Sequence, residues 1–171
     1  MISVIIETAN DEIGLAQLLA SLVPAATEGF VRDVVVIDHG STDGTLVVAD
    51  AAGCTIVRAL ASLAATHEAA VLVARSEWLL FVPPAPDALA ENWQRDAMAF
   101  IDSVMVAGTA GTRAATFHRG HIRRGWRALL GALFRDGTRA RLIAKGAWLS
   151  AARSSPALSA STVSGARRAG A

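Results

Sequence analysis

The chain is 171 residues long, is 53% hydrophobic and 18% charged, and carries a formal net charge of +1. That length suits one domain with a sizeable core, and no apolar run approaches the roughly 20 residues that cross a bilayer. The single cysteine, Cys54, excludes an internal disulfide, and a strand pattern without a basic leader comes directly after Met1, so we expect a cytoplasmic protein.

Four short apolar runs alternate with helical segments in the first half of the chain. The runs are rich in valine, isoleucine and leucine, as is typical of strands buried on both faces of a parallel sheet. Asn10 or Asp11 can cap the first helix, which is predicted to end at Pro24. The predicted strands are residues 2–6, 33–38, 54–57 and 77–82, and the two later helices are residues 45–52 and 63–75.

This order of strands and helices, with short connections, predicts parallel strands joined by right-handed crossovers. Ligands of such sheets bind beyond the carboxyl ends of the strands. The loops at residues 7–12, 38–43 and 82–87 all come after strands, so we expect them at that edge.

The second half of the chain has a less regular pattern. We expect one domain over residues 1–152 and a disordered tail over residues 153–171, where large apolar side chains are few. Within residues 87–152 we predict a helix at 87–96, strands at 99–107 and 113–118, an amphipathic helix at 120–134 and a short helix at 142–152.

The most informative segment is VVVIDHGSTDGT, at residues 34–45. Asp38 ends a buried strand, where a carboxylate can accept a hydrogen bond from a nucleobase or a ribose hydroxyl. Gly40 permits a tight backbone turn, and the polar residues after it can cap the next helix. An equally open interpretation is that Asp38 and Asp43 only order the turn between strand and helix.

This segment matches every fixed position of the D-x-G-S-T-D-G-T motif of family 2 glycosyltransferases. The segment ETANDE, at residues 7–12, also matches the family's P-T-x-N-E motif at Thr8 and Asn10. Residues 2–86 therefore resemble the nucleotide-binding half of a family 2 glycosyltransferase, and the remaining residues resemble the family only weakly.

The resemblance implies an α/β, GT-A-like fold with a mostly parallel sheet and helices on both faces. It divides the domain into a nucleotide-binding half, residues 1–86, and an acceptor-side half, residues 87–152. It also implies a nucleotide-sugar donor, such as a UDP-sugar, and an acceptor that the sequence does not identify. The residues that it places at the nucleotide are Thr8, Asn10, Glu12, Asp38, Ser41 and Asp43.

The chain departs from the family at the end of the fourth strand. The family has an acidic D-x-D-like motif there, whose carboxylates hold a divalent cation on the donor diphosphate. Here the sequence reads Val82-Pro83-Pro84-Ala85. The next carboxylate, Asp87, suits a helix cap better than a metal ligand. We therefore expect no metal site, which makes this a divergent or degenerate member of the family.

The charge is divided unevenly along the chain. Residues 1–96 hold 13 acidic and 4 basic residues, whereas residues 97–171 hold 2 acidic and 12 basic residues. The basic half either faces an anion, pairs with the acidic half or forms a solvated face. Without a metal, guanidinium groups could hold a diphosphate. The candidates are Arg113, Arg119, Arg123 and Arg124, with His118 and His121 as further donors.

A glycosyl transfer that inverts the sugar needs a carboxylate base on the acceptor side. Asp136 and Asp102 are the only acids after residue 96. Asp136 lies in a segment, residues 135–143, that loosely resembles the family's turn for that base. It is the catalytic candidate, and a turn-forming Asp-Gly is the more ordinary role for it.

The sequence leaves two hypotheses. In the first, the protein transfers a sugar from a nucleotide-sugar donor; in the second, it keeps the fold as a catalytically degenerate module that binds a nucleotide or a partner. The arginine-rich segment 120–135 could also contact a membrane surface, which would suit a lipid-linked acceptor, or could simply cover the sheet. Nucleic-acid binding is not expected, because no aromatic residues alternate with the basic ones.

Overall fold

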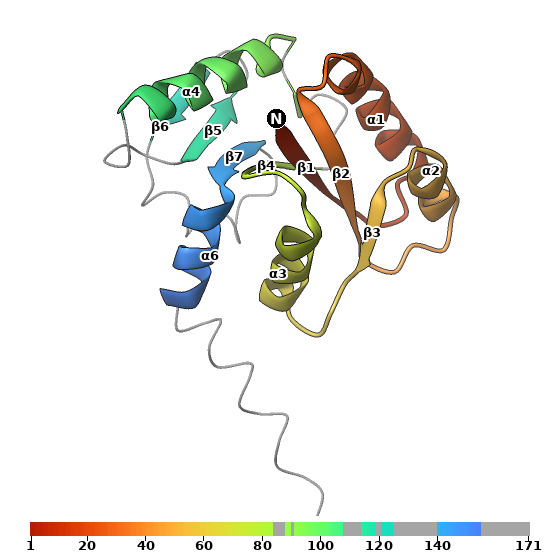
Figure 1. Ribbon diagram of the computed structural model, residues 1–171. Coiled ribbons are helices and arrows are strands. Elements are labelled where there is room, and N and C mark those ends of the chain that lie inside the picture. The colour runs from red at the N-terminus through yellow and green to blue at the C-terminus, as the bar shows by residue number, and fades with distance from the viewer. Residues whose placement is uncertain (84–87, 90, 108–113, 119–120, 125–139, 155–171) are drawn as a thin grey trace, which may run out of the picture.

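The computed structural model describes residues 1–83, 88–89, 91–107, 114–118, 121–124 and 140–154 (Figure 1). Several sequence predictions lie outside these ranges. They concern Pro84, Ala85, Asp87, Arg113, Arg119, Asp136, the segment 125–135 and the tail from residue 155.

The described residues form one sheet of seven strands in the order β3-β2-β1-β4-β7-β5-β6. Neighbours among β1 to β4 pair in parallel, whereas β7 pairs antiparallel with both β4 and β5, and β5 pairs antiparallel with β6. The α/β, mostly parallel architecture predicted from the sequence is therefore confirmed. The strands are β1 (Ile2–Thr8), β2 (Val31–Asp38), β3 (Thr55–Arg58), β4 (Trp78–Val82), β5 (Ala114–His118), β6 (His121–Arg124) and β7 (Arg141–Ala144).

Helices cover both faces of this sheet, as predicted (Figure 1). Helices α1 and α4 pack on one face, and α3 and α6 pack on the other. Helix α2 lies beside α1 at the β2–β3 side of the sheet. The helices are α1 (Glu12–Thr27), α2 (Thr45–Ala51), α3 (Leu63–Val73), α4 (Trp93–Ala107) and α6 (Lys145–Ser154).

The apolar strands separate two hydrophobic cores. In β1, Val4 and Ile6 face the α1–α4 core, while Ile5 faces the α3–α6 core, because successive side chains of a strand point to opposite faces. Each of these three side chains is at most 1% exposed. Burial on both faces explains why β1 reads as a continuous apolar run rather than an alternating one.

The prediction that the first helix stops at Pro24 is wrong, since α1 continues to Thr27. Proline cannot donate a backbone hydrogen bond, but its carbonyl can still accept one. The Pro24 carbonyl accepts from the amide of Glu28 at 3.0 Å. Pro24 lies in the last turn of α1 with an exposed side chain, where its missing amide disturbs only the end of the helix.

Three predictions for the second half are also wrong. Residues 99–107, predicted as a strand, belong to α4, because Trp93, Ala97 and Phe100 recur at helical spacing and bury against the sheet. Residues 121–124 form β6 rather than a helix, since they pair with β5. The helix predicted from residue 142 begins at Lys145, after strand β7.

Within the part of the chain that the structure describes, none of the helices combines the length and apolarity that a membrane span requires.

Candidate functional site

The candidate site is the sheet edge where β1 and β2 end. These strands pair in parallel, and the register places Thr8 opposite Asp38 at their last residues. The loops from these strand ends, toward α1 and toward α2, therefore start side by side. This adjacency brings together all six residues that the sequence assigned to a nucleotide.

Asn10 joins the two loops. Its side-chain Oδ1 accepts hydrogen bonds from the Thr42 amide at 2.8 Å and the Thr42 hydroxyl at 3.2 Å. In return, the backbone amide of Asn10 donates to the Ser41 hydroxyl at 2.9 Å. Asn10 has a φ of 49°, in the left-handed region that asparagine tolerates better than most residues. Asn10 and Ser41 thus hold the loops in register, whatever else they contact.

Asp43 and Thr45 form the second link between the loops. The Asp43 carboxylate accepts from the Glu12 amide at 3.3 Å and from the amide and hydroxyl of Thr45 at 3.0 and 2.5 Å. The Thr45 hydroxyl accepts in turn from the Asp11 amide at 3.0 Å. The pKa of Asp43 is lowered, chiefly by the hydrogen bond from the Thr45 side chain.

Glycine at position 44 leaves room for the carboxylate of Glu12. A Cβ atom at position 44 would collide with that carboxylate, so the Glu12 side chain lies directly against the second loop. The glycine of the D-x-G-S-T-D-G-T motif is therefore explained here by the close approach of the first loop, in addition to the start of α2 that it precedes.

The Asp38 side chain turns back onto its own loop. Asp38 is 1% exposed, and its two carboxylate oxygens accept from the amides of Ser41 at 3.0 Å and Gly40 at 3.2 Å. Burial raises the pKa of Asp38, but hydrogen bonding with Ser41 and Gly40 and the charge of Arg58 outweigh it and leave the pKa below its usual value. Gly40 takes a φ of 90°, which the turn requires and glycine adopts freely.

Through these hydrogen bonds Asp38 orders the turn between strand and helix, which is one of the two roles that the sequence left open for it. Each carboxylate oxygen has more than one acceptor position, so Asp38 retains acceptor capacity beyond these two bonds. Contact between Asp38 and a base remains a prediction.

Thr8 presents a buried hydroxyl at the same edge. Thr8 is 2% exposed, and among the described residues its Oγ1 is left without a hydrogen-bond partner. Its carbonyl accepts from the His39 amide at 3.0 Å. A buried hydroxyl without a partner costs free energy, and such groups in native structures often mark a place where a ligand or water completes the bonding.

Sequence reasoning missed a polar cluster on the α3–α6 side of this edge. One Glu7 carboxylate oxygen lies 2.7 Å from His67 Nε2, and the other lies 3.1 Å from His39 Nε2. The hydrogen bond from His67 lowers the pKa of Glu7 against the opposing effect of burial. Glu7 and His39 could have been noticed as polar residues at strand ends, but no local pattern connects them to the buried His67 on α3.

The end of β4 does not fit a divalent cation. Val82 is 3% exposed and Pro83 is buried, and neither side chain offers an oxygen ligand. Among the residues that the structure covers, no cluster of histidine, cysteine, aspartate and glutamate could hold a metal ion. The carboxylate of Asp87 lies outside the described residues.

The predicted phosphate ligands Arg123 and Arg124 lie on β6, at the edge of the sheet opposite β3. Three strands separate β6 from β1, which corresponds to roughly 19 Å between backbones. The fold therefore does not bring these two arginines together with the loops of Thr8 and Asp38. Arg113 and Arg119 lie outside the described residues.

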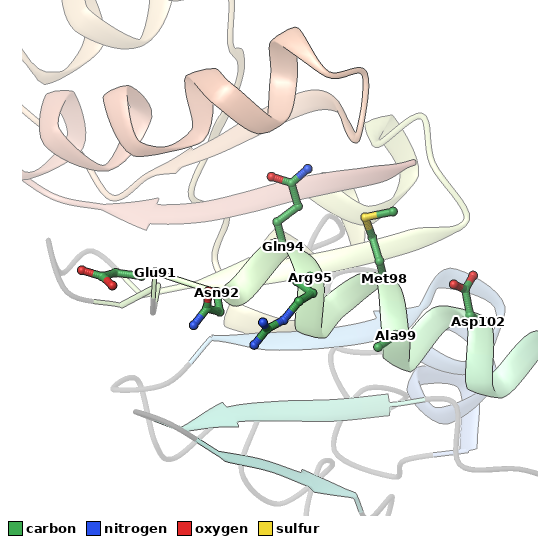
Figure 2. Close-up of a pocket in the computed structure, with 7 residues that line it drawn as sticks. All are labelled: Glu91, Asn92, Gln94, Arg95, Met98, Ala99 and Asp102. Carbon is green, nitrogen blue, oxygen red and sulfur yellow. The ribbon is translucent and has the colours of Figure 1, made fainter.

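A separate cavity of about 470 Å³ lies along α4 and the turn before it (Figure 2). Its lining comes from α4 and the residues just before that helix, and it includes both acidic and basic side chains. None of the candidate-site residues lines it. Its lining residues are Glu91, Asn92, Gln94, Arg95, Met98, Ala99 and Asp102.

No known family profile matches the sequence, and no curated protein sequence matches it. Solved structures do match the fold. Glucosyl-3-phosphoglycerate synthase from Mycobacterium tuberculosis in complex with UDP aligns with a TM-score of 0.54 and 17% identity, over 85% of this chain and 57% of that one. Its complex with Mn²⁺, UDP and phosphoglyceric acid gives a TM-score of 0.52 at 17% identity, over 85% and 56% of the two chains.

A structure described as a mycobacterial protein aligns equally well, with a TM-score of 0.54 and 19% identity, over 85% of this chain and 53% of that one. The chain thus spans little more than half the length of these structures. At such low identity the likeness shows the fold alone. It confirms the GT-A-like, nucleotide-diphospho-sugar transferase fold that the sequence motifs implied.

Proposed function

We propose that the chain is a glycosyltransferase-like domain that binds the nucleoside diphosphate of a nucleotide sugar at the carboxyl edge of β1 and β2. The observation that carries the proposal is the pair of interlocked loops at residues 8–12 and 38–45. They contain the sequence motifs of family 2 glycosyltransferases, and they occupy a binding edge of a GT-A-like sheet.

The groups at this edge suit a nucleoside. The unpartnered Thr8 hydroxyl can donate to a base carbonyl or accept from a ribose hydroxyl, and Asp38 keeps acceptor capacity for a base N–H. Asn10, Glu12, Ser41 and Asp43 act in this proposal mainly by holding the two loops in place. UDP is the first nucleotide to test, because it is bound in the glucosyl-3-phosphoglycerate synthase structures of the same fold.

The divalent metal of that fold is not part of the proposal, because the described end of β4 offers no ligand for it. The negative charge of the diphosphate must then be met by side chains of the protein. In a glycosyl transfer the diphosphate departs with the bonding electrons, so a fixed cation beside it would stabilise the transition state.

The domain division remains part of the proposal: residues 1–86 bind the nucleotide, and residues 87–152 face the acceptor. Asp136 remains the candidate base and lies outside the described residues. A cytoplasmic location, and contact between residues 120–135 and a membrane that carries a lipid-linked acceptor, are proposed on sequence grounds alone.

A degenerate module that binds a nucleotide without transferring a sugar is the second candidate. The observation that favours it is Pro83, buried where the fold otherwise supplies metal ligands. Without those ligands, an activity that depends on a metal would be lost, while the loops of Thr8 and Asp38 could still bind a nucleoside.

Calorimetric titration of the full chain with UDP and GDP, each in EDTA and in Mn²⁺, tests nucleotide binding. We expect UDP to bind in EDTA. Failure of both nucleotides to bind in either condition would refute the proposed site. If UDP binds, release of UDP from UDP-glucose separates the two candidates: slow hydrolysis that depends on the protein favours a transferase, and its absence with tight UDP binding favours the degenerate module.

A further inference from the structure

Helix α4 has a buried face and an exposed apolar face. Trp93, Ala97 and Phe100 recur at helical spacing and bury against the sheet, each at most 7% exposed. Met98 and Met105 are 47% and 72% exposed. Because successive residues of a helix are rotated by about 100°, these two methionines lie on the side of α4 opposite the buried face. The outer face of α4 is therefore partly apolar and open to solvent.

The cavity of about 470 Å³ follows this outer face (Figure 2). Its lining includes Met98 and Ala99, with Arg95 on one side of them along the helix and Asp102 on the other. Apolar groups that are rimmed by charged ones are typical of surfaces that bind another protein. The face is thus a candidate interface, and its charges indicate which partner it fits.

The two charges are placed symmetrically about the centre of the face. Arg95 comes three residues before Met98, and Asp102 comes three residues after Ala99. The Asp102 side chain is exposed, and 76% of the Arg95 side chain is exposed. In its own chain, Arg95 Nε lies 3.7 Å from Asp96 Oδ1, and an exposed ion pair of that length contributes little to stability.

A face with this symmetry is complementary to itself. Two copies of α4 can pack antiparallel about a twofold axis at the midpoint between Met98 and Ala99. Arg95 of each copy then lies opposite Asp102 of the other copy, and Met98 meets Ala99 beside the axis. Two helices packed in parallel would instead place like charges opposite each other, which is unfavourable. The charges therefore favour the antiparallel, twofold arrangement.

We propose that the outer face of α4 is the interface of a homodimer, in which two copies of this chain pack α4 against α4 in antiparallel orientation. The Arg95–Asp102 pair forms twice, once on each side of the twofold axis. Methionine suits the centre of such a contact, because its flexible thioether side chain adapts to an irregular cavity. The inference is independent of the proposed function, since none of the candidate-site residues lines this face.

The contact is small, because each copy contributes mainly one helix of 15 residues. Interfaces that bury less than about 1,200 Å² belong to weak and transient complexes. We therefore expect a dissociation constant in the micromolar range. The dimer should also weaken at high salt, because salt screens exposed ion pairs.

Sedimentation velocity of the full chain, at concentrations from about 1 to 500 µM, measures this equilibrium. The variants are Arg95→Asp, Asp102→Arg and the double exchange of both residues. Glu68→Arg, at an exposed position of α3, is the matched control, because it changes the net charge as Asp102→Arg does. Position 95 lies in the first turn of α4, where an aspartate suits the helix dipole. Thermal unfolding of each variant reports whether the fold is retained.

We expect the wild-type chain to dimerise. Each single exchange should weaken the dimer about tenfold or more, because two like-charge pairs replace two opposite-charge pairs. The double exchange should return the dissociation constant to within about threefold of the wild-type value, since it restores both pairs with their signs reversed. Glu68→Arg should match the wild type.

A wild-type chain that stays monomeric over this range would overturn the inference and leave the outer face of α4 to a partner other than a second copy. A dimer that both single exchanges leave unchanged would overturn it as well, because the contact would then lie elsewhere. A double exchange that dimerises no better than the single ones would do the same.

If an exchange unfolds the chain, Met98→Lys takes its place. This variant puts two ammonium groups beside the twofold axis and should abolish the dimer. A folded Met98→Lys chain that dimerises like the wild type would overturn the inference.

Discussion

Residues 1–83 and the second half of the chain are held in the sheet by different kinds of contact. In the first half, parallel strands are joined by crossover helices, and each strand lies beside one that is near it in sequence, except for β4. In the second half, β7 inserts between β4 and β5, and all pairing is antiparallel. The first arrangement is encoded in local periodicity, whereas the second depends on partners that the local sequence does not indicate.

The acidic and basic residues are divided between the same two halves of the chain. The acidic half supplies the two loops of the candidate site, and the basic half supplies β7 and its buried Arg141. The position of β7 beside β4 brings a cation from the basic half to the edge formed by the acidic half. The two halves are thus complementary parts of one sheet, and substitutions on either side of their boundary can test this.

The largest effect is expected from Leu80→Ala and Leu142→Ala. These residues are cross-strand partners on β4 and β7, and both are fully buried. Each truncation leaves a cavity and should lower the free energy of unfolding by about 2–5 kcal/mol. Urea denaturation followed by circular dichroism would measure the loss.

If the halves form one cooperative sheet, both variants should show a single transition with similar losses. In Leu142→Ala, β1–β4 could instead retain wild-type stability while amide exchange accelerates only in β5 and β7. That result would show that the second half is an independent unit.

A smaller effect is expected from Thr45→Val, which removes the hydroxyl that links the two loops. Thr45 is fully buried, and the change leaves the Asp11 amide without its acceptor and Asp43 without one of its donors. We expect the free energy of unfolding to fall by about 1–3 kcal/mol. Thr55→Val, at an exposed position of β3, is the control and should change stability by less than about 0.5 kcal/mol.

The pH dependence of stability should reveal Glu7, whose pKa is lowered by the hydrogen bond from His67. A carboxylate with a lowered pKa stabilises the fold above its ordinary pKa of 4.5, and this contribution is lost as the pH falls through the lower folded value. The stability difference between the wild type and Glu7→Gln should therefore be constant near neutral pH and shrink in acid. A difference that stays the same down to about pH 3 would contradict the contribution of the Glu7 charge.

The sequence predicted the fold, and the strand ends that meet at the candidate site, better than the contacts within that site. Continuous apolar runs identified β1 to β4, and the D-x-G-S-T-D-G-T match located the loop after β2, because both signals are local. The bonds between Asn10 and Thr42, or between Glu7 and His67, join residues 32 and 60 positions apart, and no local pattern specifies them. The place of Arg141 opposite Phe81 likewise arises only when β7 pairs with β4.

The smallest effect is expected from Arg123→Gln and Arg124→Gln. Their charges made them phosphate candidates in the sequence, but β6 is the strand farthest from β3, with β5 and β7 between it and β4. UDP affinity measured in EDTA should therefore change less than about twofold in either variant, since charges separated through solvent by more than about 10 Å are largely screened at about 0.1 M salt. A loss of about tenfold or more in either variant would contradict this expectation, because it would mean that β6 contributes to binding of the diphosphate.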